Sequence, residues 1–148
     1  MYDVVFLYSQ PFLEETKHSA MASDAVRTSM ERLNVARELK AIKKAAHKKQ
    51  YPLTILTRPA TAHHMLEACS YGMRIFHFCG HGQDDGIIFE SEKGVASSVN
   101  LDTIKHNFAR LIAQTGSAPP LAFLGACRSI KSGEILSQAK VPYVVASI

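Results

Sequence analysis

Apolar and polar positions follow one another along this chain in blocks that predict alternating strands and helices. Almost continuously apolar runs rich in Val, Ile, Phe and Tyr are typical of strands buried on both faces. Three- and four-residue apolar spacing instead predicts amphipathic helices. The strands are expected at 2–9, 51–59, 73–80, 118–129 and 141–148, and the helices at about 23–49, 61–72, 100–116 and 132–140. This order predicts one α/β domain over residues 1–148, a three-layer αβα sandwich around a mainly parallel sheet.

Residues that begin or end helices support several of these boundaries. Ser23 or Asp24 is a candidate N-cap of the long helix, and Thr61 is a candidate N-cap of the next one. Gly72 is expected to end that second helix, because glycine readily adopts the left-handed conformation of a helix C-terminus. The segment 86–94, with sequence GIIFESEKG, indicates one arm of a hairpin.

Positive charge is concentrated in residues 37–50, where six Lys or Arg accompany one Glu. Clustered cations can bind nucleic acid by releasing counterions from its phosphates. Cations near a helix C-terminus are also favoured by the helix dipole, and no aromatic residue before Tyr51 offers a base a stacking surface. We therefore interpret this stretch as a solvated helix end and expect no nucleic-acid partner.

The composition is that of an ordinary globular protein, with 47% hydrophobic and 20% charged residues in 148. No apolar run approaches the roughly 20 residues of a membrane span, and the N-terminus shows no basic segment before an apolar core. The three cysteines are an odd number without tight spacing, which favours a reducing compartment. We expect a cytoplasmic protein without membrane association.

The residues that carry chemistry are expected at the carboxyl ends of two strands, where open α/β sheets bind their ligands. The strand 73–80 runs into Gly-His-Gly, which places His81 at this edge, and the strand 118–129 places Cys127 there. If the two strands are neighbours, an imidazole and a thiol face one crevice, as nucleophilic catalysis requires. Gly80 and Gly82 are expected to give the turn around His81 conformations that other residues avoid, and to let a substrate approach the backbone.

The residues of this region allow two other interpretations. Cys127 alone could be a buried small hydrophobe, as most free cysteines are. Strand alternation puts His77, Cys79 and His81 on one side, which with Cys127 suggests a zinc set. Successive same-face residues lie nearly 7 Å apart, however, while zinc ligands converge to about 2.0–2.3 Å from the ion. We therefore expect no metal, and we interpret His77 and Cys79 as structural.

The two blocks MRIFHFCGHG and LAFLGACRS, followed by a short helix and VPYVVAS, resemble the CHAT group of caspase-like cysteine proteases. These are related to caspases, metacaspases and separases. The resemblance implies an endopeptidase with His81 as the general acid or base and Cys127 as the nucleophile. It also implies an oxyanion hole formed by the backbone N–H groups of Gly82 and Cys127.

The resemblance also brings expectations about the parts of the protease that bind substrate. Caspase-like folds carry a sixth strand and substrate-binding loops after the fifth strand, so we expect the chain to lack its C-terminal part. Ile130 stands where relatives often have a small residue after the nucleophile. Asp84 and Asp85 could select a basic substrate side chain, with Arg128 as a further candidate contact, although Asp-Asp-Gly is also ordinary hairpin-turn chemistry.

The sequence thus predicts a cysteine endopeptidase that cleaves proteins or peptides through a His81–Cys127 dyad, with no cofactor and no metal. A regulatory partner or the missing C-terminal segment is the expected second partner. The alternative is a catalytically silent caspase-like interaction or regulatory module, which would use an exposed strand edge to bind its partner.

Overall fold

Five parallel strands form the central sheet of the computed structural model, which describes residues 1–11 and 33–148. Their order across the sheet is β2-β1-β3-β7-β8, and every neighbouring pair is parallel. The strands are β1 (Tyr2–Tyr8), β2 (Ile55–Pro59), β3 (Met73–Cys79), β7 (Leu121–Gly125) and β8 (Tyr143–Val145). The predicted mixed α/β class with a mainly parallel sheet is confirmed.

The interior strands explain why the chain carries such continuous apolar runs. In β1, which lies between β2 and β3, Val4 to Leu7 are each at most 2% exposed, so both faces of this strand are covered. In β3, Phe76 and Phe78 point to one face of the sheet and join the main hydrophobic core. His77 and Cys79 alternate with them and therefore point to the other face.

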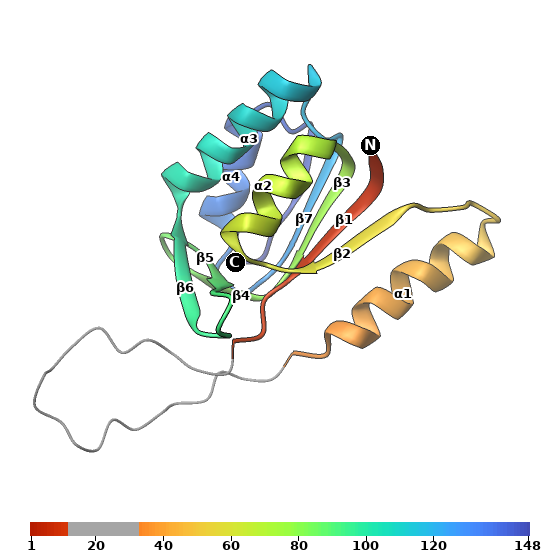
Figure 1. Cartoon of the computed structure of the whole chain (residues 1–148), viewed down its shortest axis with the longest axis horizontal. Helices are drawn as coiled ribbons and strands as arrows, with labels where there is room; N and C mark the ends of the chain where they lie inside the picture. The colour runs from red at the N-terminus through yellow and green to blue at the C-terminus, as the bar shows by residue number, and fades with distance from the viewer. Residues whose placement is uncertain (12–32) are drawn as a thin grey trace, which may run out of the picture.

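Helices cover the two faces unequally (Figure 1). The helices α2 (Ala62–Tyr71), α3 (Leu101–Thr115) and α4 (Ile130–Gln138) pack on the face of Phe76 and Phe78, with Phe108 of α3 and Leu136 of α4 fully buried. The helix α1 (Val35–Lys48) lies on the opposite side and contributes no buried residue. No helix in the described ranges is long and apolar enough to cross a membrane.

A small antiparallel sheet, β4-β5-β6, adjoins the carboxyl ends of β1 and β3 (Figure 1). Its strands are β4 (His81–Gln83), β5 (Gly86–Glu90) and β6 (Ala96–Asn100). The expected hairpin arm at 86–94 is confirmed as β5 with its following turn, whereas β4 and β6 were not predicted. The chain bends at Gly80 as it passes from the main sheet into this second sheet.

The helix boundaries confirm the two expected caps of α2 and correct part of the predicted long helix. The side chain of Thr61 accepts a hydrogen bond from the N–H of His64, and Gly72 ends the helix with a φ of +74°. The predicted long helix was wrong over residues 33–34, because α1 begins at Val35 with Asn34 as its N-cap. The candidate caps Ser23 and Asp24 lie outside the described residues.

Candidate functional site

The strands that lead to His81 and Cys127 are neighbours in the sheet. Cys79 at the end of β3 pairs with Gly125 at the end of β7, and the N–H of Gly80 donates to the carbonyl oxygen of Gly125 at 3.2 Å. This backbone hydrogen bond joins the two segments just before they continue to His81 and Cys127. The predicted juxtaposition of the two strand ends is therefore confirmed.

Beyond this hydrogen bond, the backbone at Gly82 packs directly against the backbone at Cys127. A Cβ atom added to Gly82 would overlap the carbonyl oxygen of Cys127 and would lie 3.3 Å from the Cβ of Ala126. Only a residue without a side chain fits at this position. The segments that carry the imidazole and the thiol are thus held in van der Waals contact.

Cys127 itself occupies a tight turn between β7 and α4. Cys127 is exposed, so the interpretation of this residue as a buried hydrophobe was wrong. Arg128, the next residue, has a φ of +53°, a left-handed conformation that is uncommon for a non-glycine residue and costs about 1–3 kcal/mol. Ser129 braces the turn, because its buried hydroxyl donates to the carbonyl of Leu124 at 3.4 Å and accepts from the N–H of Ser147 at 3.0 Å.

The imidazole of His81 is half-buried at the start of β4. Its Nε2 atom is buried and has no hydrogen-bond partner among the described residues. This nitrogen therefore makes no hydrogen bond to the Cys127 thiol in the described part of the chain, and catalytic hydrogen bonds often tighten only when substrate binds. The ring nitrogen is therefore not committed to a structural contact.

The glycines around His81 serve close packing. Neither Gly80 nor Gly82 has a φ in the left-handed region, so the expectation that they relax the turn was wrong. A Cβ on Gly80 would lie 2.8 Å from Cε1 of Phe78, whose ring is completely buried and cannot move aside. Both positions need glycine because neighbouring groups fill the space of a side chain.

The weaker candidate residues lie on the exposed rim of this region. Asp84 and Asp85 form the two-residue turn between β4 and β5, and both are exposed, as the hairpin interpretation predicts. The carbonyl of Asp85 accepts from the N–H of Leu101, which joins this turn to the start of α3. Arg128 is exposed beside Cys127.

On the other face of the sheet, two polar side chains meet at one carboxylate. Glu38 of α1 lies with Oε1 2.5 Å from Nε2 of His77 and with Oε2 2.9 Å from the sulfur of Cys79. The expectation that His77 and Cys79 share a face is confirmed. The extension of that alternation to His81 was wrong, because His81 begins a strand of the second sheet.

Burial sets the protonation of this cluster. Desolvation lowers the pKa of His77 in spite of the adjacent Glu38, so the ring is neutral at pH 7 and Nε2–H donates to the carboxylate. Burial, together with the Glu38 carboxylate, raises the pKa of Cys79 to about 12, so its thiol stays protonated and also donates. Cys69, on the buried side of α2, has a pKa raised to about 11 by the same desolvation.

Sequence reasoning overlooked Glu38. The signal was present, since Glu38 falls on the half-buried side of α1 with Val35, Leu39 and Ile42, where an amphipathic helix normally carries apolar residues. Within residues 1–11 and 33–148, no group of three or more His, Cys, Asp or Glu is arranged to hold a metal ion. His77 and Cys79 are bridged by the carboxylate.

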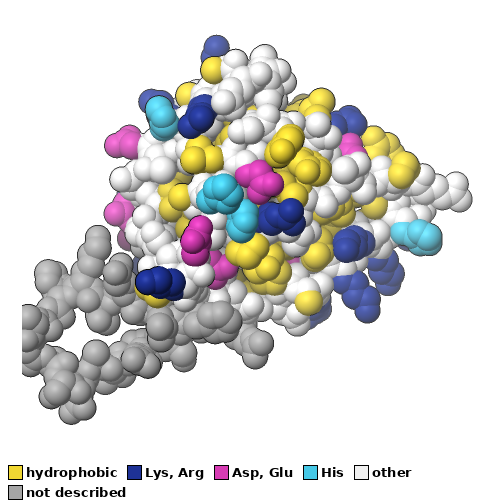
Figure 2. Space-filling view, in the orientation of Figure 1, with side chains coloured by type: hydrophobic (Ala, Val, Ile, Leu, Met, Phe, Trp, Pro, Cys, Tyr) yellow, Lys and Arg dark blue, Asp and Glu magenta, His cyan; other side chains and the backbone are white. Residues whose placement is uncertain are grey.

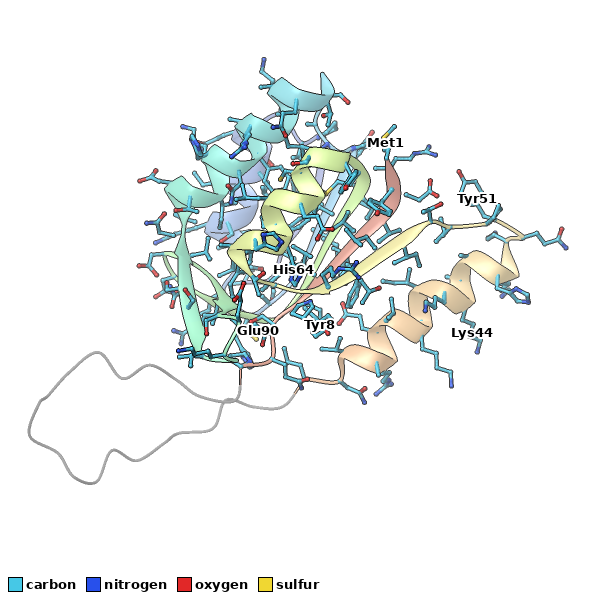
Figure 3. The ribbon with its side chains drawn as sticks, viewed as in Figure 1. Met1, Tyr8, Lys44, Tyr51, His64 and Glu90 are labelled. Carbon is cyan, nitrogen blue, oxygen red and sulfur yellow. The ribbon has the colours of Figure 1, made fainter. Side chains whose placement is uncertain are left out.

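The basic residues of α1 lie away from these sites. Lys and Arg side chains gather along the outer side of α1 (Figure 2), and Lys44 projects from the side turned away from the sheet (Figure 3). All six Lys or Arg between Arg37 and Lys49 are exposed. This arrangement matches the predicted solvated helix end.

Taken together, the carboxyl edge of the sheet offers an exposed thiol, an imidazole with an uncommitted nitrogen, and a rigid glycine contact that holds their segments together. Such a set can support transfer of an acyl group to sulfur. Comparison of the chain with protein-family models and with curated proteins gave no match.

Proposed function

We propose that the protein is a caspase-like cysteine endopeptidase that acts through His81 and Cys127. The observation that carries this proposal is the contact between Gly82 and Cys127, which brings the imidazole segment and the thiol segment to one edge of the sheet. The order of the strands is compatible with the caspase-like fold implied by the sequence resemblance. The substrates are proteins or peptides, and the proposed compartment is the cytoplasm.

In the proposed reaction the imidazole of His81 takes the thiol proton, and the sulfur of Cys127 attacks the carbonyl carbon of the scissile peptide bond. The C–N bond breaks as the proton passes from His81 to the departing amine. Water then hydrolyses the thioester, with His81 again accepting and returning a proton. Apart from this water molecule, no group outside the chain and the substrate is required for the balance.

The developing oxyanion needs hydrogen-bond donors that are already in place. The backbone N–H of Cys127 donates to no acceptor within the described part of the chain. The N–H of Gly82, on the adjoining segment, is the second proposed donor. Removing one such donor typically costs about 10²–10³ in rate.

The test combines activity with thiol reactivity. Cleavage of fluorescently labelled casein is measured for the parent, Cys127→Ala, His81→Ala and the control Cys69→Ala, alongside the rate of iodoacetamide modification of Cys127. We expect both site variants to lose cleavage, Cys69→Ala to keep it, and His81→Ala to slow alkylation of Cys127 on the order of tenfold. Cleavage that survives Cys127→Ala, or alkylation that is indifferent to His81, contradicts the proposal.

One feature favours the alternative of an interaction module. The edge strand β8 leaves Tyr143 71% and Val145 47% exposed, and an open groove of Ile130, Gly133, Glu134, Ser137, Gln138, Val144 and Ala146 runs beside it. Exposed strand edges pair readily with extended segments of other chains. A regulatory partner bound here would remain bound to Cys127→Ala, which separates the two functions.

A further inference from the structure

Glu38 occupies an unusual position for a charged residue. It is the single acidic residue of α1, and it lies on the half-buried, sheet-facing side of that helix. A carboxylate on an apolar helix face is unfavourable unless buried donors satisfy it. The structure supplies those donors from β3, at His77 and Cys79.

The same carboxylate also touches the strand that leads to the nucleophile. A Cβ added to Gly125 of β7 would lie 3.1 Å from Oε1 of Glu38, so this oxygen sits directly beneath the last residue of β7. Cys79 precedes His81 by two residues, and Gly125 precedes Cys127 by two. The Glu38 side chain therefore contacts both strands at positions two residues before His81 and Cys127.

We propose that Glu38 is a positioning residue for His81 and Cys127: from α1 it accepts hydrogen bonds from His77 and Cys79 beneath Gly125 and so fixes the carboxyl ends of β3 and β7 relative to each other. This inference rests on the proposed function. In this proposal Glu38, which is not a member of the dyad, keeps His81 and Cys127 at the correct distance from each other.

The physical basis is that, among the residues the structure describes, the Glu38 carboxylate is the acceptor hydrogen-bonded to both His77 and Cys79. In Glu38→Gln a single amide oxygen replaces the two carboxylate oxygens, so the N–H of His77 and the thiol of Cys79 no longer each have an acceptor, and one of them is left as a buried donor without a partner. The strands relax locally to reach new acceptors. The Gly80 to Gly125 hydrogen bond, 3.2 Å long and adjacent to the cluster, is the contact that this relaxation weakens first.

Reactivity depends steeply on such geometry, because a misplacement of about 1 Å far from the chemistry can cost on the order of 10²-fold. An imidazole shifted away from the thiol no longer assists its ionisation. Glu38 therefore influences Cys127 through His81, and its effect disappears when His81 is absent.

The test uses the full chain with Glu38→Gln, the conservative Glu38→Asp, and Glu92→Gln as a charge-matched control in an exposed turn. Exchange of the Gly80 amide hydrogen is followed by NMR. In parallel, iodoacetamide modification of Cys127 at pH 7 is timed with His81 present and with His81→Ala. If Glu38→Gln prevents folding, Glu38→Asp, which keeps the charge on a shorter arm, carries the test by itself.

In Glu38→Gln we expect the Gly80 amide hydrogen to exchange faster. We also expect the factor by which His81 speeds alkylation of Cys127 to fall from on the order of tenfold towards onefold. Glu38→Asp should be intermediate in both measurements, and Glu92→Gln should behave like the parent. Unchanged exchange overturns the inference. So does faster exchange with the full His81 dependence retained, because Glu38 then has only a structural role. If alkylation of Cys127 in the parent does not depend on His81, the proposed function is contradicted without any change at Glu38. The positioning role of Glu38 is then contradicted as well.

Discussion

The imidazole of His77 stacks on the ring of Phe123, with the ring centroids 4.6 Å apart and the planes inclined by 22°. Phe6 stacks on the opposite side at 4.8 Å, so the histidine is enclosed between two aromatic rings from the neighbouring strands. Among the residues that the structure describes, the titratable groups at this ring are Glu38, which contacts its edge, and Cys79, whose thiol shares the same carboxylate. This enclosure is the physical reason for the lowered pKa of His77.

Folding stability should therefore fall as the pH decreases through about 6.5. In the unfolded chain His77 takes up a proton near its ordinary pKa of 6.5, whereas the folded protein resists that proton until a lower pH. The unfolded state then binds more protons, so acid favours it. Urea unfolding of the parent and of His77→Gln between pH 5 and 8 measures the effect, and His77→Gln should show a smaller loss below pH 6.5. Equal slopes in the two proteins would refute this assignment.

The three cysteines should differ sharply in reactivity towards iodoacetamide. Cys127 is exposed, whereas Cys69 and Cys79 are buried and have pKa values raised to about 11 and 12. Because the thiolate is the reactive form, we expect Cys127 to be modified first at pH 7 and the other two only after unfolding. Mass spectrometry of the folded protein identifies the modified residue. Early modification of Cys79 would mean that α1 does not hold its place over β3.

Gly82→Ala should disturb the site more than a comparable change elsewhere. The added methyl overlaps the backbone of Cys127, and overpacking of this kind costs about 1–3 kcal/mol. Gly116→Ala is the matched control, because its φ of +81° is strained for alanine but its side-chain space is open. We expect both variants to be less stable in urea, while only Gly82→Ala loses the His81-dependent alkylation of Cys127. Retention of that dependence in Gly82→Ala would disprove the role of this contact.

Asn34→Ala should loosen α1 without unfolding the rest of the domain. The Asn34 side chain accepts from the N–H of Arg37 at 3.0 Å, and loss of such a cap costs about 1 kcal/mol. Since α1 contributes no buried residue, the melting temperature should change little. Hydrogen exchange in residues 38–48 should nevertheless accelerate, with Asn100→Ala at the start of α3 as the control. A uniform acceleration across α2, α3 and α4 would contradict this separation.

Much of the fold could be predicted from local signals. The unbroken apolar run of β1 indicated a central strand, and Thr61 and Gly72 marked both ends of α2 because their effects are confined to one helical turn. The three-residue strand β4 could not be recognised, since His-Gly-Gln has no apolar alternation and is defined by its pairing with Gly86 to Ile88. The start of α1 was misplaced because an apolar spacing continues through its cap, Asn34.

The candidate site shows the same division. The positions of His81 and Cys127 followed from the rule that parallel strands present their carboxyl ends at one edge. The amphipathic pattern of α1 marks Glu38 as unusual, but its partner His77 is 39 residues away in sequence, and no local pattern identifies that partner. The tight approach of Gly82 to Cys127 was likewise hidden, because a glycine required by packing looks the same in sequence as one required by conformation.

The order β2-β1-β3-β7-β8 also constrains how the chain folds. β1 is the first strand in the chain, and both strands that pair with it come later in the sequence. The pairing of β1 with β3 requires Tyr2 to reach Met73. The entropy of closing these long loops is lost before the pairing compensates for it, so the rate-limiting step should be long-range strand assembly. Helix α1 lies within the loop closed by β1 and β2 and buries no side chain, so its ordering can follow that step without slowing it.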